Sequence, residues 1–144
     1  MKTQKPYVSL LLVFGLWLGL ILGCSSFRKA MDEKRAEREG PAITISAEDL
    51  YKAYVSNEAE ADKLYQGKIL IVTGTVGTPV VGIGNPAVDL IGANQKPIVQ
   101  CLGFATDEKD TISKLKTGQK VTVKGKCMGK VAMDIPVLED SVLQ

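Results

Sequence analysis

The acidic residues and cysteines of this 144-residue sequence are the side chains that could carry out acid–base or nucleophilic chemistry, but their spacing is not typical of a catalytic site. The chain contains no histidine, so it lacks the commonest general base and metal ligand of proteins. Glu58 and Asp62 are spaced as on one face of a predicted helix, which is typical of a solvated surface rather than of a catalytic pair. The glycine-rich residues 82–86 precede a predicted strand, whereas a phosphate-binding loop precedes a helix. The sequence therefore predicts a protein that is not an enzyme and that needs no metal or cofactor.

The amino-terminal residues have the three-part layout of a signal peptide. Lys2 and Lys5 form a short positive segment, residues 8–22 form an apolar run, and the small residues 23–26 follow it. A helix needs about 20 apolar residues to cross a hydrocarbon core of about 30 Å, and this run has only 15 residues. A plain transmembrane anchor remains the alternative.

Cys24 ends the sequence Ile-Leu-Gly-Cys, residues 21–24, which resembles the lipobox of bacterial lipoproteins. The resemblance implies that Cys24 carries a diacylglycerol, that residues 1–23 are removed as a lipoprotein signal peptide, and that the new amino terminus is acylated, for example with palmitate. Several acyl chains hold a protein firmly on a membrane, because each buried methylene contributes about 0.8 kcal/mol. Ser25 and Ser26 resemble the sequence of lipoproteins sorted to an outer membrane. We therefore expect an extracytoplasmic protein anchored there, or in the cell membrane of a source that has no outer membrane.

Charges of both signs alternate in the segment that follows the predicted anchor. This pattern, which ends at Gly40 and Pro41, is typical of a solvated helix or tether. Residues 24–41 are therefore predicted to be the acylated cysteine and a charged tether, and residues 42–144 the folded domain. The folded part is nearly neutral, because residues 41–144 hold 11 lysines, no arginine and 12 acidic residues.

The folded domain opens with two predicted helices. Ser46, with an aspartate three residues later, makes a capping box for a helix over residues 47–56. Asn57 is the predicted cap of a second helix, which reaches residue 65. Three apolar residues share one face of the first helix: Leu50, Tyr54 and Val55.

Beyond Gly67 the sequence changes to short runs rich in β-branched residues, which predict strands. Gly74 lies inside the first run, where a bulge or a sharp coil is expected. A helix over residues 107–116, with Thr106 as cap and Gly118 as stop, is predicted between the third and fourth strands. The five predicted strands cover residues 68–76, 87–91, 96–104, 120–130 and 135–143.

The order of three strands, one helix and two strands is that of the OB-fold, a five-stranded Greek-key barrel. We therefore predict a mainly β protein with an OB-fold barrel, one helix between strands three and four, and an N-terminal helical segment. Residues 46–143 also resemble the tRNA-anti-like family of bacterial OB-fold envelope proteins, which implies the same fold and compartment. The resemblance rests on the segments AEDLYKAYVSNEAEADKLYQGKILIVTGTV, VQCLGF, LKTGQKVTVKGKCMG and VLEDSVL, with Gly74, Cys101, Gly118, Gly125 and Cys127 as its best marks.

Cys101 and Cys127 are the two cysteines of the predicted domain. An oxidising compartment favours a disulfide between them, which the chain-entropy model values at about 3–4 kcal/mol. Strands three and four of an OB barrel are not direct neighbours, however, and the family often has a cysteine where this chain has Ser141. Two buried free thiols therefore remain the alternative.

The family name suggests nucleic acid as the ligand, but few residues of the barrel support it. OB-folds bind single strands through a basic groove and stacked aromatic side chains. The chain from residue 68 onward contains one aromatic residue, Phe104, and no arginine. Four lysines on one predicted strand fit the outward side of a solvated strand: Lys120, Lys124, Lys126 and Lys130.

We expect the binding region at strands two and three and at the flexible loop of residues 77–87, because OB-folds bind ligands there. The apolar pair Val80 and Val81 in this loop favours a protein partner over an envelope glycan, and Ile83 and Asn85 complete the predicted binding loop. The sequence thus predicts a non-catalytic, lipid-anchored binding module of the bacterial envelope. A single-stranded nucleic-acid-binding protein is the alternative.

Overall fold

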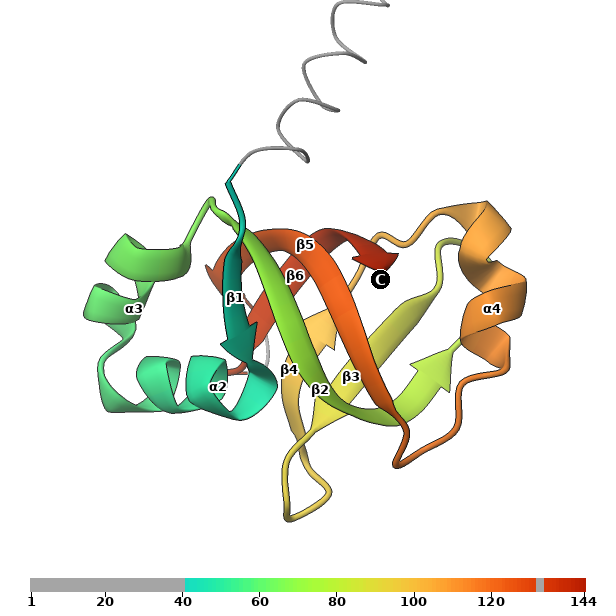
Figure 1. The fold of residues 1–144 in the computed structure, drawn as a ribbon, viewed down its shortest axis with the longest axis horizontal. Coiled ribbons are helices and arrows are strands. Elements are labelled where there is room, and N and C mark those ends of the chain that lie inside the picture. The colour runs from blue at the N-terminus through green and yellow to red at the C-terminus, as the bar shows by residue number, and fades with distance from the viewer. Residues whose placement is uncertain (1–40, 132–133) are drawn as a thin grey trace, which may run out of the picture. The chain divides into compact units, whose positions relative to one another are not determined.

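The computed structural model describes residues 41–131 and 134–144, which form a folded domain (Figure 1). The predicted signal peptide, Cys24 and the tether up to residue 40 lie outside the described residues. Within the described part, no helix is long and apolar enough to span a bilayer.

The elements of the domain are, in chain order, β1 (Ile43–Ser46), α2 (Ala47–Ser56), α3 (Glu58–Tyr65), β2 (Ile69–Val80), β3 (Ala87–Ile91), β4 (Pro97–Cys101), a 3₁₀ turn (Thr106–Glu108), α4 (Lys109–Ser113), β5 (Lys120–Lys130) and β6 (Pro136–Leu143). The long strand β2 pairs with both β3 and β5, and the ladder continues from β3 through β4 and β6 back to β5. Five strands therefore close into a barrel. This closed barrel, with one helix between β4 and β5, confirms the predicted OB-fold.

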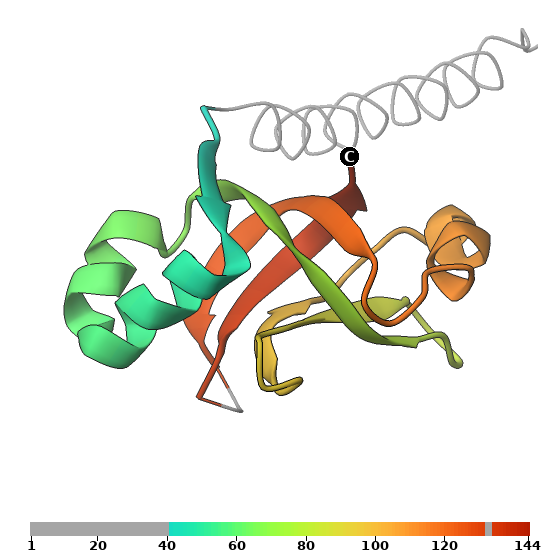
Figure 2. The ribbon, with the colours of Figure 1, turned by 60° about the horizontal axis from the view of Figure 1, so that its bottom comes forward.

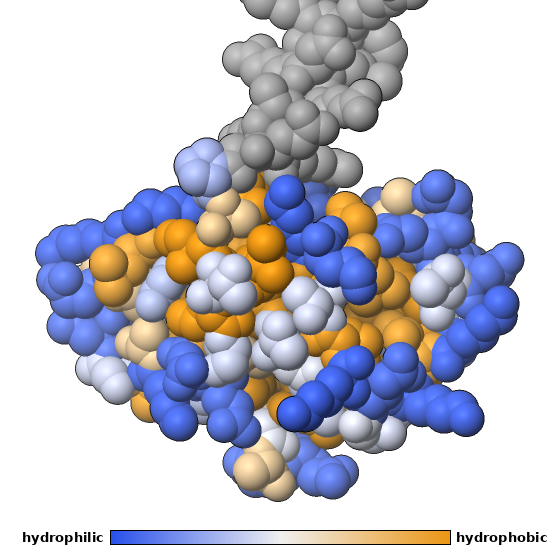
Figure 3. All heavy atoms as spheres, viewed as in Figure 1, coloured by the Kyte–Doolittle hydropathy of each residue, from blue (hydrophilic) through white to orange (hydrophobic). Residues whose placement is uncertain are grey.

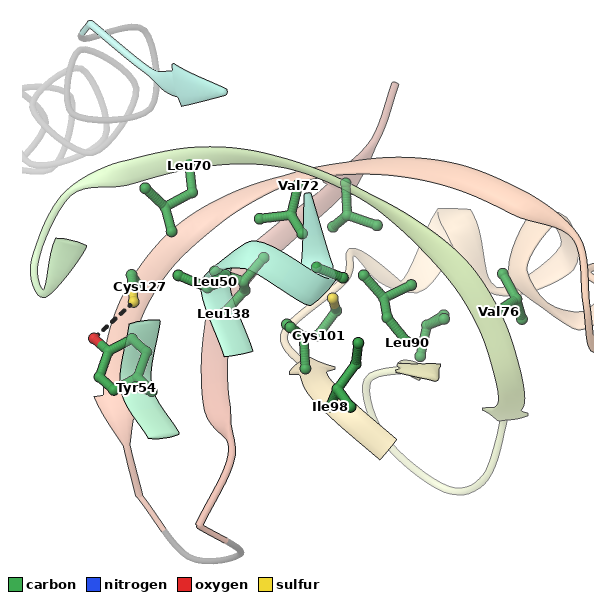
Figure 4. Packing of buried hydrophobic residues seen from close by; sticks show 14 of the residues in the cluster. Leu50, Tyr54, Leu70, Val72, Val76, Leu90, Ile98, Cys101, Cys127 and Leu138 are labelled. Atoms are coloured by element: carbon green, nitrogen blue, oxygen red, sulfur yellow. Dashed lines mark hydrogen bonds between the residues drawn. The ribbon is translucent and has the colours of Figure 1, made fainter. Parts of the chain in front are cut away.

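Helices cover both ends of the barrel. α2 and α3 lie at one end and α4 at the other in both views of the ribbon (Figures 1 and 2). Leu50 and Tyr54 of α2 and Ile112 of α4 are almost completely buried and belong to one core cluster with the strands. Figure 4 shows Leu50 and Tyr54 among the inward side chains of the barrel. The fully buried strand residues of this cluster are Leu70, Val72, Val76, Val88, Leu90, Val99, Cys101, Val123, Cys127 and Leu138.

Two side-chain caps define the helical segment, as predicted. Ser46 Oγ accepts a hydrogen bond from the Asp49 amide at 3.0 Å, and Asn57 Oδ1 accepts one from the Glu60 amide at 3.3 Å. Asn57 also ends α2, because its amide donates to the Ala53 carbonyl while its extended backbone breaks the helix. The predicted position of Val55 on the apolar face is wrong: its exposed fraction is 62%.

Strand β1 was not predicted. It pairs in parallel with β2, from Ile43 opposite Leu70 to Ser46 opposite Thr73. Its four residues are too few to show an alternating pattern, and the pairing partner lies far along the chain. β1 runs directly into α2, so it fixes where that helix begins relative to the barrel.

Gly74 does not form the expected bulge. It pairs regularly with Val121 of β5, and the register shift of β2 lies between Val76 and Pro79. A Cβ atom at Gly74 would come within 2.9 Å of the Cβ atom of Ala47 and of Leu90 Cδ1. The glycine is therefore needed because the start of α2 packs directly on the backbone of β2.

The helix between β4 and β5 is shorter than predicted. A 3₁₀ turn precedes α4, and the helix ends at Ser113 rather than near residue 116. Thr106 does not cap it; instead the Glu108 carboxylate accepts a hydrogen bond from the Ala105 amide at 3.3 Å. Gly118 follows as predicted, with a positive φ of 90° and its amide bonded to the Val76 carbonyl.

Candidate binding surfaces of the barrel

The predicted binding loop is the tip of the hairpin that joins β2 and β3. β2 continues to Val80 and β3 begins at Ala87, so the loop comprises residues 81–86 rather than 77–87, and Val80 is the last strand residue. The exposed fractions are 55% for Val80, 39% for Val81 and 112% for Ile83, and Asn85 is also exposed. We call Val80, Val81 and Ile83 the hairpin tip. It presents three neighbouring apolar side chains to solvent, which marks a candidate contact surface.

Two side-chain contacts hold the hairpin backbone, one in the loop and one in β2. Lys109 Nζ of α4 donates to the Gly82 carbonyl at 2.8 Å, and Thr117 Oγ1 donates to the Gly77 carbonyl at 2.8 Å. Pro86 is buried. Figure 1 shows the hairpin rising beside α4. The backbone of the hairpin is therefore held from one side, while its apolar side chains remain available.

The outer face of β3 and β4 is the second place where OB-folds bind ligands. Asp89 and Gln100 lie opposite each other on these strands and are half-buried. Burial raises the pKa of the Asp89 carboxyl, while its hydrogen bond with Gln100 acts in the opposite direction. A half-buried carboxyl group on this face is unfavourable for a phosphate backbone, because like charges repel there.

The row of lysines on β5 does not form a free basic stripe. Lys130 makes ion pairs with Glu58 at 3.0 Å and Asp134 at 3.5 Å, and only 17% of its side chain is exposed. Lys126 lies opposite Glu139 of β6 in the ladder. Phe104, the aromatic residue of the barrel, is fully buried and cannot stack on a base. On the face seen in Figure 3, hydrophilic residues alternate with neutral and apolar ones.

Cys101 and Cys127 are buried free thiols in the structure, which is the second of the two alternatives that the sequence left open. Both residues pair with Leu138, because β6 lies between β4 and β5. Adjacent strands are about 4.8 Å apart, which separates the two Cα atoms by about 10 Å, whereas a disulfide spans at most about 7 Å. Figure 4 shows Leu138 in the space between the two cysteines.

A buried polar cluster joins the helices to the barrel. The Tyr54 hydroxyl donates to Asp62 Oδ1 at 3.0 Å and lies 3.5 Å from Cys127 Sγ (Figure 4). Burial, followed by the neighbouring thiol and carboxylate, raises the pKa of Tyr54, and burial also raises the pKa of Cys127 and Cys101. All three groups therefore stay protonated at neutral pH. The cluster holds α2 and α3 on β5 and offers no nucleophile.

A hollow lies away from the predicted loop, between α2 and the turn that joins β3 and β4. Its volume is about 640 Å³. The sequence did not predict it, because the position of α2 beside the barrel depends on two long-range contacts. These are the pairing of β1 with β2 and the packing of the start of α2 on β2. The single available signal was Tyr51, an aromatic residue beside the buried face of α2. The lining residues are Glu48, Tyr51, Lys52, Gly92, Ala93, Asn94, Lys96, Pro97, Ile98 and Ile135.

Two smaller hollows continue along the face formed by β1, β2 and β5. The first, of about 290 Å³, shares Glu48 with the large hollow, and the second, of about 380 Å³, shares Thr73 and Lys120 with the first. Thr73 and Thr122 contact each other there, with 3.1 Å between their hydroxyl oxygens. Among the described residues, no group of three or more Cys, Asp or Glu side chains is placed to hold a metal ion.

A closed five-stranded barrel with its helix between the third and fourth barrel strands defines an OB-fold protein. The chain matches the tRNA_anti-like family model over residues 1–142 and therefore belongs to the tRNA-anti-like family. Its fold is similar to that of the "putative nucleic acid-binding lipoprotein" from Klebsiella pneumoniae subsp. pneumoniae MGH 78578, with a TM-score of 0.55 and 20% sequence identity over 72% of this chain and 92% of that chain. No curated protein matches the sequence.

Proposed function

We propose that the protein is a non-catalytic OB-fold binding module, anchored by lipid at Cys24 on the outer side of a bacterial membrane, and that it binds a protein partner. The observation that carries the proposal is the hairpin tip. Its three apolar side chains are exposed although the backbone beneath them is held by Lys109 and Thr117. A fixed apolar surface of this kind is costly to leave in water and favours a protein contact over a sugar.

The lipid anchor is supported by the resemblance of residues 21–24 to a lipobox. The fold similarity to a protein named as a lipoprotein agrees with it. In this proposal residues 24–41 form the acylated cysteine and the charged tether, and the domain from residue 42 onward does the binding. The ligand class second to a protein partner is an envelope glycan.

Site-specific photo-crosslinking in intact cells tests this function. A photoreactive phenylalanine analogue replaces Ile83 in one variant and Val55 in a control, because Val55 is exposed on α2, at the other side of the domain. We expect a discrete protein adduct at position 83 that is absent at position 55. Adduct formation must also disappear when Val80→Asp is added. Equal adducts at both positions, or none at position 83, would overturn the proposed contact.

A single-stranded nucleic acid is the second candidate ligand, favoured by the name of the Klebsiella protein with the same fold. This alternative predicts an affinity for oligonucleotides that falls steeply as salt concentration rises, because phosphate contacts release counterions. The full-length protein in detergent is titrated with a labelled single strand at several salt concentrations. Our proposal expects no binding, or binding without a salt slope.

A further inference from the structure

The large hollow beside α2 combines an apolar floor with a polar rim. Ile98 and Ile135 are 5% and 6% exposed, so they form a floor at the surface of the core. Tyr51 and Pro97 add apolar surface at the side. The volume of about 640 Å³ lies within the range of about 300–1,000 Å³ that is usual for small-ligand sites.

Four polar side chains surround this floor without partners of their own. Within the described part of the chain, neither the Lys52 and Lys96 ammonium groups nor the Glu48 carboxylate makes a hydrogen bond or an ion pair, and the Tyr51 hydroxyl makes none. Other lysines of the domain are engaged, as Lys63 is with Glu60 and Lys130 is with Glu58. The rim therefore offers two cationic donors, one anionic acceptor and a hydroxyl to the same hollow.

Three backbone amides in the turn beside the hollow are already paired within the turn. In the turn between β3 and β4, the Gly92 amide donates to the Lys96 carbonyl, the Gln95 amide to the Gly92 carbonyl, and the Lys96 amide to Asn94 Oδ1. A peptide that binds by strand addition needs unpaired backbone groups at an edge. These three amides are not available for strand addition, whereas the side chains of the rim are free to bind, which suits a ligand rich in hydroxyl groups.

The charges of the rim indicate which chemical class of ligand fits the hollow. Two lysines against one glutamate favour a ligand that carries a carboxylate, whereas Glu48 needs hydrogen-bond donors such as hydroxyl or amide groups. A saccharide places an apolar C–H face and a polar edge on the same ring, which matches an apolar floor inside a polar rim. A polyphosphate backbone would instead meet the Glu48 carboxylate.

We propose that the hollow formed by α2 and the β3–β4 turn binds an acidic saccharide of the envelope, with Lys52 and Lys96 contacting its carboxylate and Glu48 its hydroxyl or amide donors. This inference rests on the proposed envelope function but uses a site separate from the hairpin tip. The protein thus has two surfaces, one for a saccharide and one for a protein partner.

Calorimetric titration of the full-length protein in detergent tests the saccharide site with two probes. The disaccharide of N-acetylglucosamine and N-acetylmuramic acid carries a lactyl carboxylate, and chitobiose is its neutral counterpart. We expect the acidic disaccharide to bind about five- to tenfold more tightly than chitobiose, as for two solvent-exposed ion pairs with the lysines. Equal affinity for the two probes, or no binding of the acidic one, would overturn the proposal.

Paired substitutions then locate the site. The double variant Lys52→Gln, Lys96→Gln should remove the preference for the acidic disaccharide, while the control Lys114→Gln, Lys116→Gln, also at exposed lysines, should keep it. If both double variants lost the preference for the acidic disaccharide equally, the preference would depend on net charge alone, and the assignment of the site would be wrong. Displacement of the disaccharide by a single-stranded oligonucleotide would also overturn it, in favour of nucleic acid. The crosslink at position 83 reports the hairpin tip independently, so failure of one site is distinguishable from failure of the other.

Discussion

Two regions of the domain use apolar side chains in opposite ways. At the end of the barrel covered by α2, Leu50 and Tyr54 are buried, and the polar cluster of Tyr54, Asp62 and Cys127 attaches the helices to β5. At the hairpin tip, Val81 and Ile83 are exposed, and the polar contacts hold only the backbone beneath them. The apolar side chains of the helical end therefore contribute to stability, whereas those of the tip remain exposed to solvent.

Truncation of Leu50 should give the largest effect. Leu50→Ala removes a fully buried side chain and should lower the free energy of unfolding by about 2–5 kcal/mol through lost burial and a cavity. Val55→Ala on the same helix should change it by less than about 0.5 kcal/mol, because Val55 is exposed. Urea unfolding followed by circular dichroism measures both. Equal effects would mean that α2 does not pack on the barrel as described.

A methyl group at Gly74 should give the next largest effect. Gly74→Ala places a Cβ atom against Ala47 and Leu90, so we expect a loss of about 1–3 kcal/mol in the free energy of unfolding. Gly82→Ala in the hairpin loop is the control, because no atom lies within 4 Å of the added Cβ. A neutral Gly74→Ala variant would show that α2 does not approach β2 closely.

The buried thiol of Cys101 should make the stability depend on alkaline pH. Burial raises the pKa of Cys101 above the ordinary value of 9.0, so the thiol ionises in the unfolded chain but not in the folded one. The stabilisation that comes from keeping this thiol protonated is therefore fully present below pH 9 and is lost as the pH rises above 9. At pH 10 the free energy of unfolding should be lower by about 1.4 kcal/mol per thiol than at pH 7. Urea unfolding of Cys101→Ala at both pH values should show a correspondingly smaller decrease, and an unchanged decrease would contradict the assignment.

Substitution at the hairpin tip should have the smallest effect on stability. Ile83→Asp changes a fully exposed side chain, so the free energy of unfolding should stay within about 0.5 kcal/mol of its original value. The same substitution should abolish crosslinking of the partner through a photoreactive group at Val81. A destabilised Ile83→Asp variant would mean that the tip packs on the domain, and the contrast between the two regions would fail.

Local patterns were sufficient to predict most of the barrel. The cap residues Ser46 and Asn57 and the alternation in β5 set the bounds of their elements correctly, because these signals act within a few residues. Long-range pairing was not visible: β1 is recognisable only beside β2, and β2 continues through Pro79, which usually ends a strand.

The sites were harder to predict than the fold. The apolar tip could be predicted from Val80 and Val81, although the loop was placed too broadly. Whether Cys101 and Cys127 can form a disulfide depends on the strand order, because β6 lies between the two strands that carry them. The hollow beside α2 depends on how the helix meets the β3–β4 turn, a long-range contact for which Tyr51 was the one sign in the sequence.

The measurement that tests the central claim most directly is the intact mass of the protein extracted from membranes, compared with a Cys24→Ala variant. A lipid-anchored envelope module predicts a mature chain that begins at Cys24 and carries acyl chains, with neither processing nor acylation in the variant. A mass equal to that of all 144 residues without acyl chains would contradict the account and leave residues 8–22 as a transmembrane anchor.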